Sequence, residues 1–119
     1  MQRILVVDDS PTEQNAIRQP LEASGYQVVI ASGGDEGLDR MEREPFDLLV
    51  LDVIMPGKNG FQICRQIRRD ARWVSLPILM VTSKDQDADR FWGMKQGATE
   101  YITKPFNAND LITAVQRHI

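Results

Sequence analysis

The sequence predicts an α/β fold: a doubly wound sheet of five parallel strands, with five helices covering both of its faces. Five short apolar runs alternate with segments of helical spacing, the order typical of parallel sheets joined by right-handed crossovers. Each run is continuously apolar rather than alternating, so both faces of each strand should be buried. The runs span residues 4–7, 28–30, 48–51, 78–81 and 101–102.

The length of 119 residues suits one domain, residues 1–119. The net charge of −3 argues against general nucleic-acid binding, because phosphate contacts need an excess of Lys and Arg. Cys64 is the only cysteine, which excludes an internal disulfide and fits a reducing compartment. No apolar run approaches the roughly 18 residues of a membrane span, and the N-terminus does not resemble a signal peptide. We therefore expect a cytoplasmic protein without membrane insertion.

The first helix should begin directly after the first strand. Ser10 suits the N-cap, Pro11 the first helical position, and Glu13 the acidic position of a capping box. Gly25 suits the C-terminal end of this helix. Pro20 lies inside the pattern, where it removes a backbone hydrogen bond at a cost of about 3 kcal/mol unless the helix bends.

The remaining helices are marked by apolar residues at helical spacing. Pro45 should stop the second helix, and Asn107 is a candidate N-cap for the last. Residues 85–96 form a weakly amphipathic segment whose packing the pattern does not define. The marking positions are Leu38 and Met41, then Ile63, Cys64 and Ile67, and finally Leu111, Ala114, Val115 and His118.

Acidic residues follow two of the strands. The first run leads directly into Asp8 and Asp9, and the third leads into Asp52. In a doubly wound sheet the ligand site lies at the carboxyl ends of the strands, so these three carboxylates should converge there. They would repel one another unless a hard divalent cation such as Mg²⁺ joined them. The alternative is that Asp8 and Asp9 only stabilise the N-terminus of the first helix.

Two more strand ends carry polar groups. The fourth run ends in Thr82 and Ser83, and the fifth is followed by Lys104. A hydroxyl, a cation and a metal around the Asp52 carboxylate are what a bound phosphoryl group requires. Taken singly, Thr82 could be an ordinary strand residue and Lys104 a surface lysine. Together with the acidic residues they predict a phosphoryl site.

The whole chain resembles response-regulator receiver domains of the CheY type. The resemblance rests on Asp8-Asp9, on residues 52–60 (Asp-Val-Ile-Met-Pro-Gly-Lys-Asn-Gly), on Thr82-Ser83 and on Lys104-Pro105. It implies a strand order of 2-1-3-4-5 and phosphorylation of Asp52 by a histidine kinase, with the domain catalysing its own phosphotransfer and dephosphorylation. Residues 10–13 and 92–98 are also similar to single-domain receivers of pilus-twitching chemosensory systems.

The resemblance also implies a role for each site residue. Asp9, Asp52 and the backbone carbonyl of Ile54 would ligate Mg²⁺, and Asp8 would support the metal through its water. Lys104 would hold a phosphoryl oxygen. Ile54 carries no polar group that could orient an attacking water, and from this we hypothesise a comparatively long-lived phosphorylated state.

Switching would involve Thr82 and Tyr101. The resemblance implies that Thr82 rotates towards the phosphoryl group and that the ring of Tyr101 turns inward; the alternative is a fixed, half-buried tyrosine. Signals would pass through the face of the fourth helix, fifth strand and fifth helix, where Arg90, Met94 and Tyr101 should lie.

Two adjacent aromatic residues, Phe91 and Trp92, lie on the same helix. We expect one of them to face the core and the other to be a candidate partner anchor.

Three readings of the pathway remain open. The chain ends about where the last helix should, which favours a stand-alone switch that binds an effector protein, as a monomer or a phosphorylation-dependent dimer. It could instead be the receiver part of a longer DNA-binding transcription factor. A third possibility is a phosphate sink that drains a shared kinase. A module that ignores phosphate is disfavoured, because every expected site residue is present.

Overall fold

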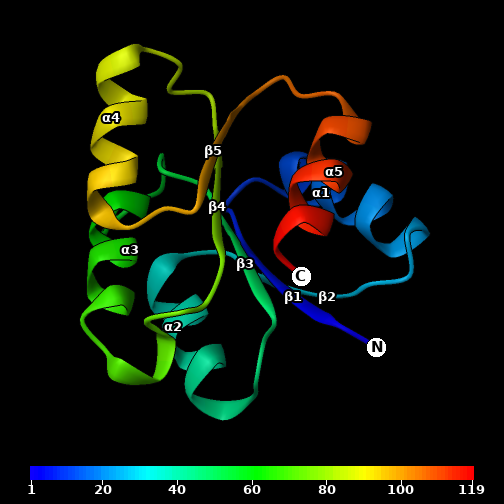
Figure 1. Ribbon diagram of the computed structural model, residues 1–119, viewed down its shortest axis with the longest axis horizontal. Coiled ribbons are helices and arrows are strands. Elements are labelled where there is room, and N and C mark those ends of the chain that lie inside the picture. Colours follow the sequence, from blue (N-terminus) through cyan, green and yellow to red (C-terminus); the bar gives the residue numbers. More distant parts are fainter.

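The computed structural model describes residues 1–119 and contains one parallel sheet of five strands in the order β2-β1-β3-β4-β5. This confirms the predicted fold class and strand order. Helices α2, α3 and α4 cover one face of the sheet, while α1 and α5 cover the other (Figure 1). The strands are β1 Arg3–Val7, β2 Gln27–Ala31, β3 Leu48–Leu51, β4 Ile78–Thr82 and β5 Glu100–Thr103.

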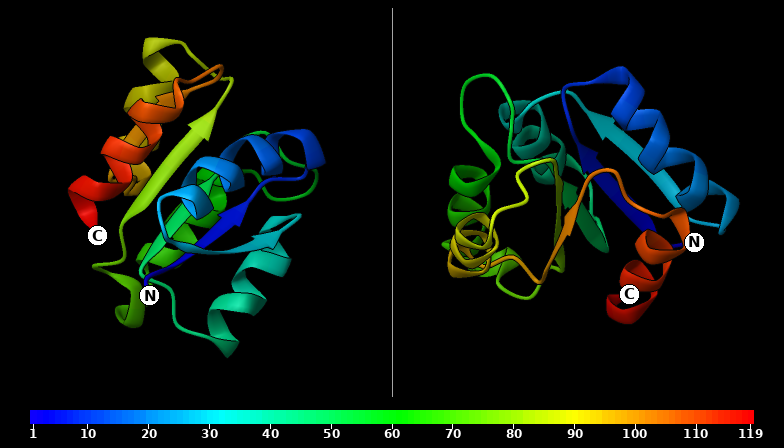
Figure 2. Two further views of the ribbon diagram at one scale, coloured as in Figure 1. Left: turned by 90° about the vertical axis from the view of Figure 1, so that its right-hand side faces the viewer. Right: turned by 90° about the horizontal axis from the view of Figure 1, so that it is seen from above.

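Each strand is followed by a helix, as the alternating pattern predicts. The two helical layers and the sheet between them are visible from the side and from above (Figure 2). None of the helices combines the length and the apolar character that a bilayer crossing needs. The helices are α1 Pro11–Ala23, α2 Gly34–Arg43, α3 Gly60–Arg68, the short 3₁₀ helix η1 Ala71–Trp73, α4 Asp87–Gln96 and α5 Ala108–His118.

The sheet separates two hydrophobic cores. Successive residues of the central strands point to opposite faces, so Leu5 and Val7 join the core under α2, α3 and α4, whereas Ile4 and Val6 join the core under α1 and α5. The residues of β1, β3 and β4 are buried with one exception, Arg3 at the edge of β1. Burial on both faces explains why their sequences are continuously apolar.

Helix α1 begins and ends as predicted, except at its capping box. The Oγ of Ser10 accepts a hydrogen bond from the Glu13 amide, and Gly25 follows the helix with a φ of 94°. The Ser10 amide, however, donates to Asp8 Oδ1 at 3.0 Å, so Glu13 does not complete the box. Pro20 lies within the helix, which continues to Ala23, and nothing in the structure explains its presence.

Helix α4 corrects one expectation, because neither of its aromatic side chains faces the core. Phe91 is 63% exposed and Trp92 is 48% exposed. The buried positions of the helix are Gly93 and Gln96. A Cβ at Gly93 would lie 2.8 Å from the ring of Tyr101, so the glycine lets the helix backbone rest directly on that ring. The weak amphipathicity of the segment concealed which face is buried.

Arg68 ties three segments together at the end of the sheet opposite the strands' carboxyl ends. Its guanidinium donates to the carbonyl oxygens of Gly97 at 2.9 Å, Trp73 at 2.9 Å and Leu76 at 2.6 Å. These hydrogen bonds join the end of α3 to the η1 turn and to the end of α4. Burial lowers the pKa of Arg68 from its ordinary value, but the group stays charged at any physiological pH.

Candidate functional site

Three carboxylates meet at the carboxyl ends of β1 and β3. One oxygen from each of Asp8, Asp9 and Asp52 lies within 4.8 Å of the others. Asp8 and Asp52 are buried, whereas Asp9 is exposed. The cluster forms because β1 and β3 are neighbours and run parallel, with Val7 paired with Leu51 at their ends. The residues that directly follow these strands therefore lie side by side.

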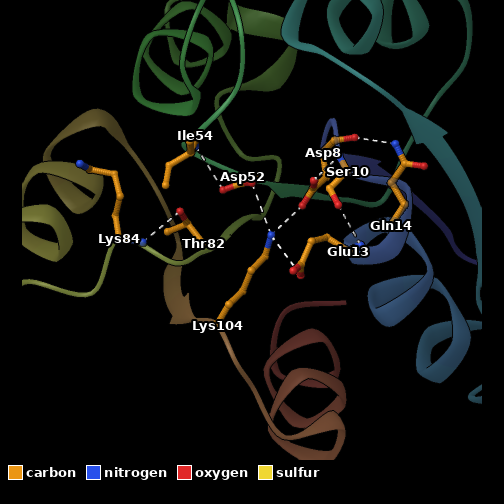
Figure 3. Close-up of polar contacts among 9 residues, drawn as sticks. All are labelled: Asp8, Ser10, Glu13, Gln14, Asp52, Ile54, Thr82, Lys84 and Lys104. Atoms are coloured by element: carbon orange, nitrogen blue, oxygen red, sulfur yellow. Dashed lines mark hydrogen bonds and ion pairs between the residues drawn. The ribbon is translucent and has the colours of Figure 1, made fainter.

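Lys104 supplies the positive charge of the site from the loop after β5. Its Nζ lies 2.8 Å from Asp8 Oδ2 and 3.4 Å from Asp52 Oδ2 (Figure 3). The lysine side chain is only 10% exposed. Burial alone would lower the pKa of Lys104, but the hydrogen bond to Asp8 and the charge of Asp52 outweigh burial and raise that pKa. The ammonium group is thus firmly charged. The Lys104–Pro105 peptide bond is cis.

Backbone groups hold the two buried carboxylates. The Ser10 amide donates to Asp8 Oδ1 at 3.0 Å, and the Ile54 amide donates to Asp52 Oδ1 at 3.2 Å. Burial raises the pKa of Asp8, against the opposing effect of its hydrogen bond with Lys104. Gly60 fixes the loop after Asp52, because a Cβ there would lie 2.2 Å from the Asp52 carbonyl oxygen. The start of α3 therefore packs directly on the backbone of Asp52.

An open cavity of about 640 Å³ leads from solvent to the Asp52 carboxylate. One part of its wall is polar and contains Asp8, Ser10, Glu13, Asp52, Ser83 and Lys104. The apolar part contains Ala16, Ile54, Pro105, Phe106 and Ala108. A small molecule could therefore reach Asp52, and a larger one would contact α1 and the loop after β5.

The hydroxyl predicted at the end of β4 lies beside this cavity. Thr82 is fully buried, and its Oγ accepts a hydrogen bond from the Lys84 amide at 3.3 Å (Figure 3). Its neighbour Ser83 is exposed and lines the cavity directly. The structure thus places Thr82 next to the acidic cluster but with its side chain engaged by the backbone of the following loop.

Tyr101 lies between α4 and the loop after β4. The ring is buried, with 9% of its surface exposed, and its hydroxyl donates to the Lys84 carbonyl oxygen at 2.7 Å. Burial raises the pKa of Tyr101 to about 12. Arg90 covers the ring at 5.4 Å and donates to the Tyr101 carbonyl oxygen, while Met94 is exposed on α4. Of the three residues expected on the partner surface, Arg90 and Met94 are exposed.

Glu13, for which the sequence pattern predicts only a capping role, is also part of the site. Its carboxylate reaches across to Lys104, with Oε2 3.5 Å from Nζ. The position of Pro11 in the sequence indicates that this contact is possible. Pro11 starts α1 only two residues after Asp9, so the first helical turn lies at the carboxyl edge of the sheet.

The donor set suits a hard divalent cation. The carboxylates of Asp8, Asp9 and Asp52 cluster beside one ammonium group, which Glu13 also contacts, so the site has an excess of negative charge. All three offer oxygen atoms within one coordination sphere, and oxygen is the ligand that Mg²⁺ prefers. Asp9 is exposed and the cavity is open to solvent, so a metal ion and its remaining water ligands could reach the carboxylates.

Comparison with known sequences identifies the family. The family model of the response regulator receiver domain matches residues 4–116. Protein PilH of Pseudomonas aeruginosa is 44% identical over 115 residues, which cover 97% of this chain and 95% of PilH. The alkaline phosphatase synthesis transcriptional regulatory protein PhoP of Bacillus subtilis is 41% identical over 114 residues. These cover 96% of this chain but 47% of PhoP, so the chain spans about half the length of that relative.

Solved structures agree with this match. Chemotaxis protein CheY4 of Vibrio cholerae superposes with a TM-score of 0.93 at 33% identity, over 100% of this chain and 99% of CheY4. The match to the family model, the relatives and the shared fold lead to one conclusion: the chain belongs to the response regulator receiver domains of two-component systems.

Proposed function

We propose that Asp52 accepts a phosphoryl group from a phosphohistidine of a histidine kinase. One observation carries the proposal: the Asp52 carboxylate lies at the inner end of an open cavity, 3.4 Å from the ammonium group of Lys104. An anionic phosphoryl group entering this cavity meets both a nucleophile and a counter-charge.

The reaction needs little more than positioning. An Asp52 oxygen attacks phosphorus in line, the bond from phosphorus to the imidazole nitrogen breaks, and the electron pair leaves with the imidazole. Lys104 attracts the phosphoryl oxygens, and the Ile54 amide holds the other oxygen of Asp52 in place. Asp8, Asp9, Asp52 and the carbonyl of Ile54 would hold Mg²⁺, which when bound supplies further neutralisation of the phosphoryl charge.

The signal is proposed to leave through Thr82, Tyr101 and the surface of α4, β5 and α5. Thr82 would exchange its hydrogen bond with Lys84 for one to the phosphoryl group, and Tyr101 would respond through the same loop. An unidentified effector protein would then contact Arg90 and Met94. Phosphorylation must favour one state by roughly 5.5 kcal/mol to move the population from nearly all-off to nearly all-on.

We place this switch in a motility pathway of the cytoplasm. The support is similarity to PilH and to a chemotaxis protein, together with the free thiol of Cys64. A receiver within a longer transcription factor remains the second candidate, favoured by the match to one half of PhoP. The transcription-factor candidate would become the first choice under two findings together. The phosphorylated chain would bind no motility protein, and a longer protein containing this receiver would bind operator DNA.

The decisive experiment is phosphorylation of the purified chain. Incubation with acetyl phosphate and Mg²⁺ should add one phosphate to the intact mass, and the addition should be absent without metal. Asp52→Ala should take up none, whereas Asp39→Ala, a change at an exposed aspartate on α2, should behave as wild type. Phosphate on Asp52→Ala would mean that another residue is the acceptor. No phosphate on the folded wild type, from either acetyl phosphate or a phosphorylated histidine kinase, would refute the proposal.

The lifetime of the phosphorylated form can be measured in the same assay. Ile54 is exposed and lines the cavity beside Asp52. Its aliphatic side chain cannot orient a water for attack on the acyl phosphate, so Ile54→Asn should speed dephosphorylation. An unchanged rate in Ile54→Asn would contradict the long-lived state.

A further inference from the structure

Glu13 occupies an unusual position for a residue in the first turn of a helix. The capping pattern would direct its carboxylate to the Ser10 amide, but that amide already donates to Asp8. The Glu13 side chain extends instead into the cavity, where its Oε2 lies 3.5 Å from Lys104 Nζ (Figure 3). It is 40% exposed, whereas the other two carboxylates around Lys104 are buried.

Lys104 therefore has three anionic neighbours. Asp8 and Asp52 are each held by a backbone amide and cannot leave. The Glu13 carboxylate makes no hydrogen bond, pairs only with Lys104 and is the most exposed of the three. When phosphoryl oxygens approach Lys104, Glu13 is the neighbour that can be displaced, and until then its charge repels them.

We propose that Glu13 is a displaceable counter-charge for Lys104: it holds the ammonium group in the unmodified domain and slows the loading of Asp52 by anionic phosphoryl donors. The inference rests on the proposed phosphorylation of Asp52. Glu13 forms no bond to the donor and acts through Lys104, so it is a positioning residue. A domain built in this way resists small anionic phosphodonors and leaves activation to a docked kinase, which can displace the Glu13 side chain.

The test compares Glu13→Gln with wild type. The initial rate of phosphate addition to Asp52 is measured by intact mass at several concentrations of acetyl phosphate with Mg²⁺. At low donor concentration Glu13→Gln should load about threefold to tenfold faster, as expected for removing one charge a few ångströms from an incoming dianion. This difference should shrink as ionic strength rises, because salt screens an exposed charge.

Two variants separate charge from structure. Glu22→Gln removes a carboxylate from an exposed position on the same helix, so it should load as wild type does. Glu13→Asp keeps the charge on a shorter side chain and should retain most of the slow loading. Circular dichroism confirms that each variant is folded before rates are compared.

The outcomes distinguish this inference from the function on which it rests. Equal loading rates for wild type, Glu13→Gln and Glu22→Gln would overturn the role of Glu13 and leave Asp52 as the acceptor. Slower loading in Glu13→Gln would also overturn it, because the carboxylate would then assist the reaction. If the folded wild type takes up no phosphate from any donor, the proposed function fails and the role of Glu13 fails with it.

Discussion

Replacing Lys104 by methionine tests the electrostatic balance of the site. Methionine keeps most of the aliphatic stem but removes the ammonium group, leaving the buried carboxylates of Asp8 and Asp52 without a cation. At neutral pH the variant should therefore be much less stable than wild type. It should also lose phosphate uptake on Asp52, since the proposed counter-charge for the phosphoryl group is gone.

The size of the loss follows from the distances. Opposite charges 2.8 Å and 3.4 Å apart attract by about 6 and 5 kcal/mol at an effective dielectric constant of about 20. Part of this attraction only offsets the cost of removing the ammonium group from water, and breaking a buried pair typically costs about 3–5 kcal/mol. A chain of this length has a total stability of about 6–18 kcal/mol, so the variant loses a large share of it.

Urea unfolding followed by circular dichroism measures this loss. With a slope of about 2 kcal/mol per molar urea, the midpoint should fall by about 1.5–2.5 M. Lys58→Met is the matched control: Lys58 is exposed, lies 3.6 Å from the exposed Asp35 and should contribute little. If both variants unfold at the same urea concentration, Lys104 does not neutralise the buried cluster and the electrostatic argument fails.

Three other perturbations test the packing around the site. Arg68→Met should lower the free energy of unfolding by about 2–4 kcal/mol, because three carbonyl groups lose a charged donor; Arg69→Met, at an exposed neighbour, should have little effect in the same urea titration. Gly60→Ala should cost more than about 2 kcal/mol, since its Cβ would collide with backbone atoms, whereas Gly33→Ala meets open space and should be tolerated. Burial raises the pKa of Cys64 from its ordinary 9.0 to about 11, so the native thiol should not react with a thiol reagent at pH 8. As pH rises, the thiol ionises in the unfolded chain before it ionises in the folded one. The contribution of Cys64 to stability is therefore constant below pH 9 and is lost between pH 9 and 11. A Cys64→Ala variant should lack this part of the fall in stability at alkaline pH.

The strands and the acidic cluster could be predicted because both follow from short-range rules. A continuously apolar run defines a doubly buried strand, and a parallel sheet brings the residue after each such strand to one edge. Asp8, Asp52 and Lys104 needed no further information to be placed together.

Other features depend on the rotation of a helix about its own axis or on long-range contacts. The segment of α4 has apolar residues on several sides, so its sequence could not show that Gly93 faces the sheet while Phe91 and Trp92 face solvent. The contact from Glu13 to Lys104 spans most of the chain, and a capping pattern explained Glu13 equally well. Arg68 binds backbone carbonyl oxygens, so the pattern of side chains in the sequence does not indicate its partners.

The Arg68 hydrogen bonds determine how α4 can move. At its C-terminal end the helix is fastened to α3, because Arg68 binds the Gly97 carbonyl and the Cys64 thiol contacts the Gln96 carbonyl at 3.4 Å. Near its N-terminal end the helix contacts other segments: Arg90 donates to the Tyr101 carbonyl oxygen at 3.1 Å, and Asp89 lies 3.6 Å from Lys84 in the loop after β4. A tilt of α4 about its C-terminal end would therefore change these N-terminal contacts first. Ten residues span about 15 Å, so a tilt of about 10° would displace the first turn by about 2.5 Å and the last turn hardly at all. In such a tilt, motion would be greatest beside the loop after β4, next to the acidic cluster, and smallest at the opposite end of the molecule.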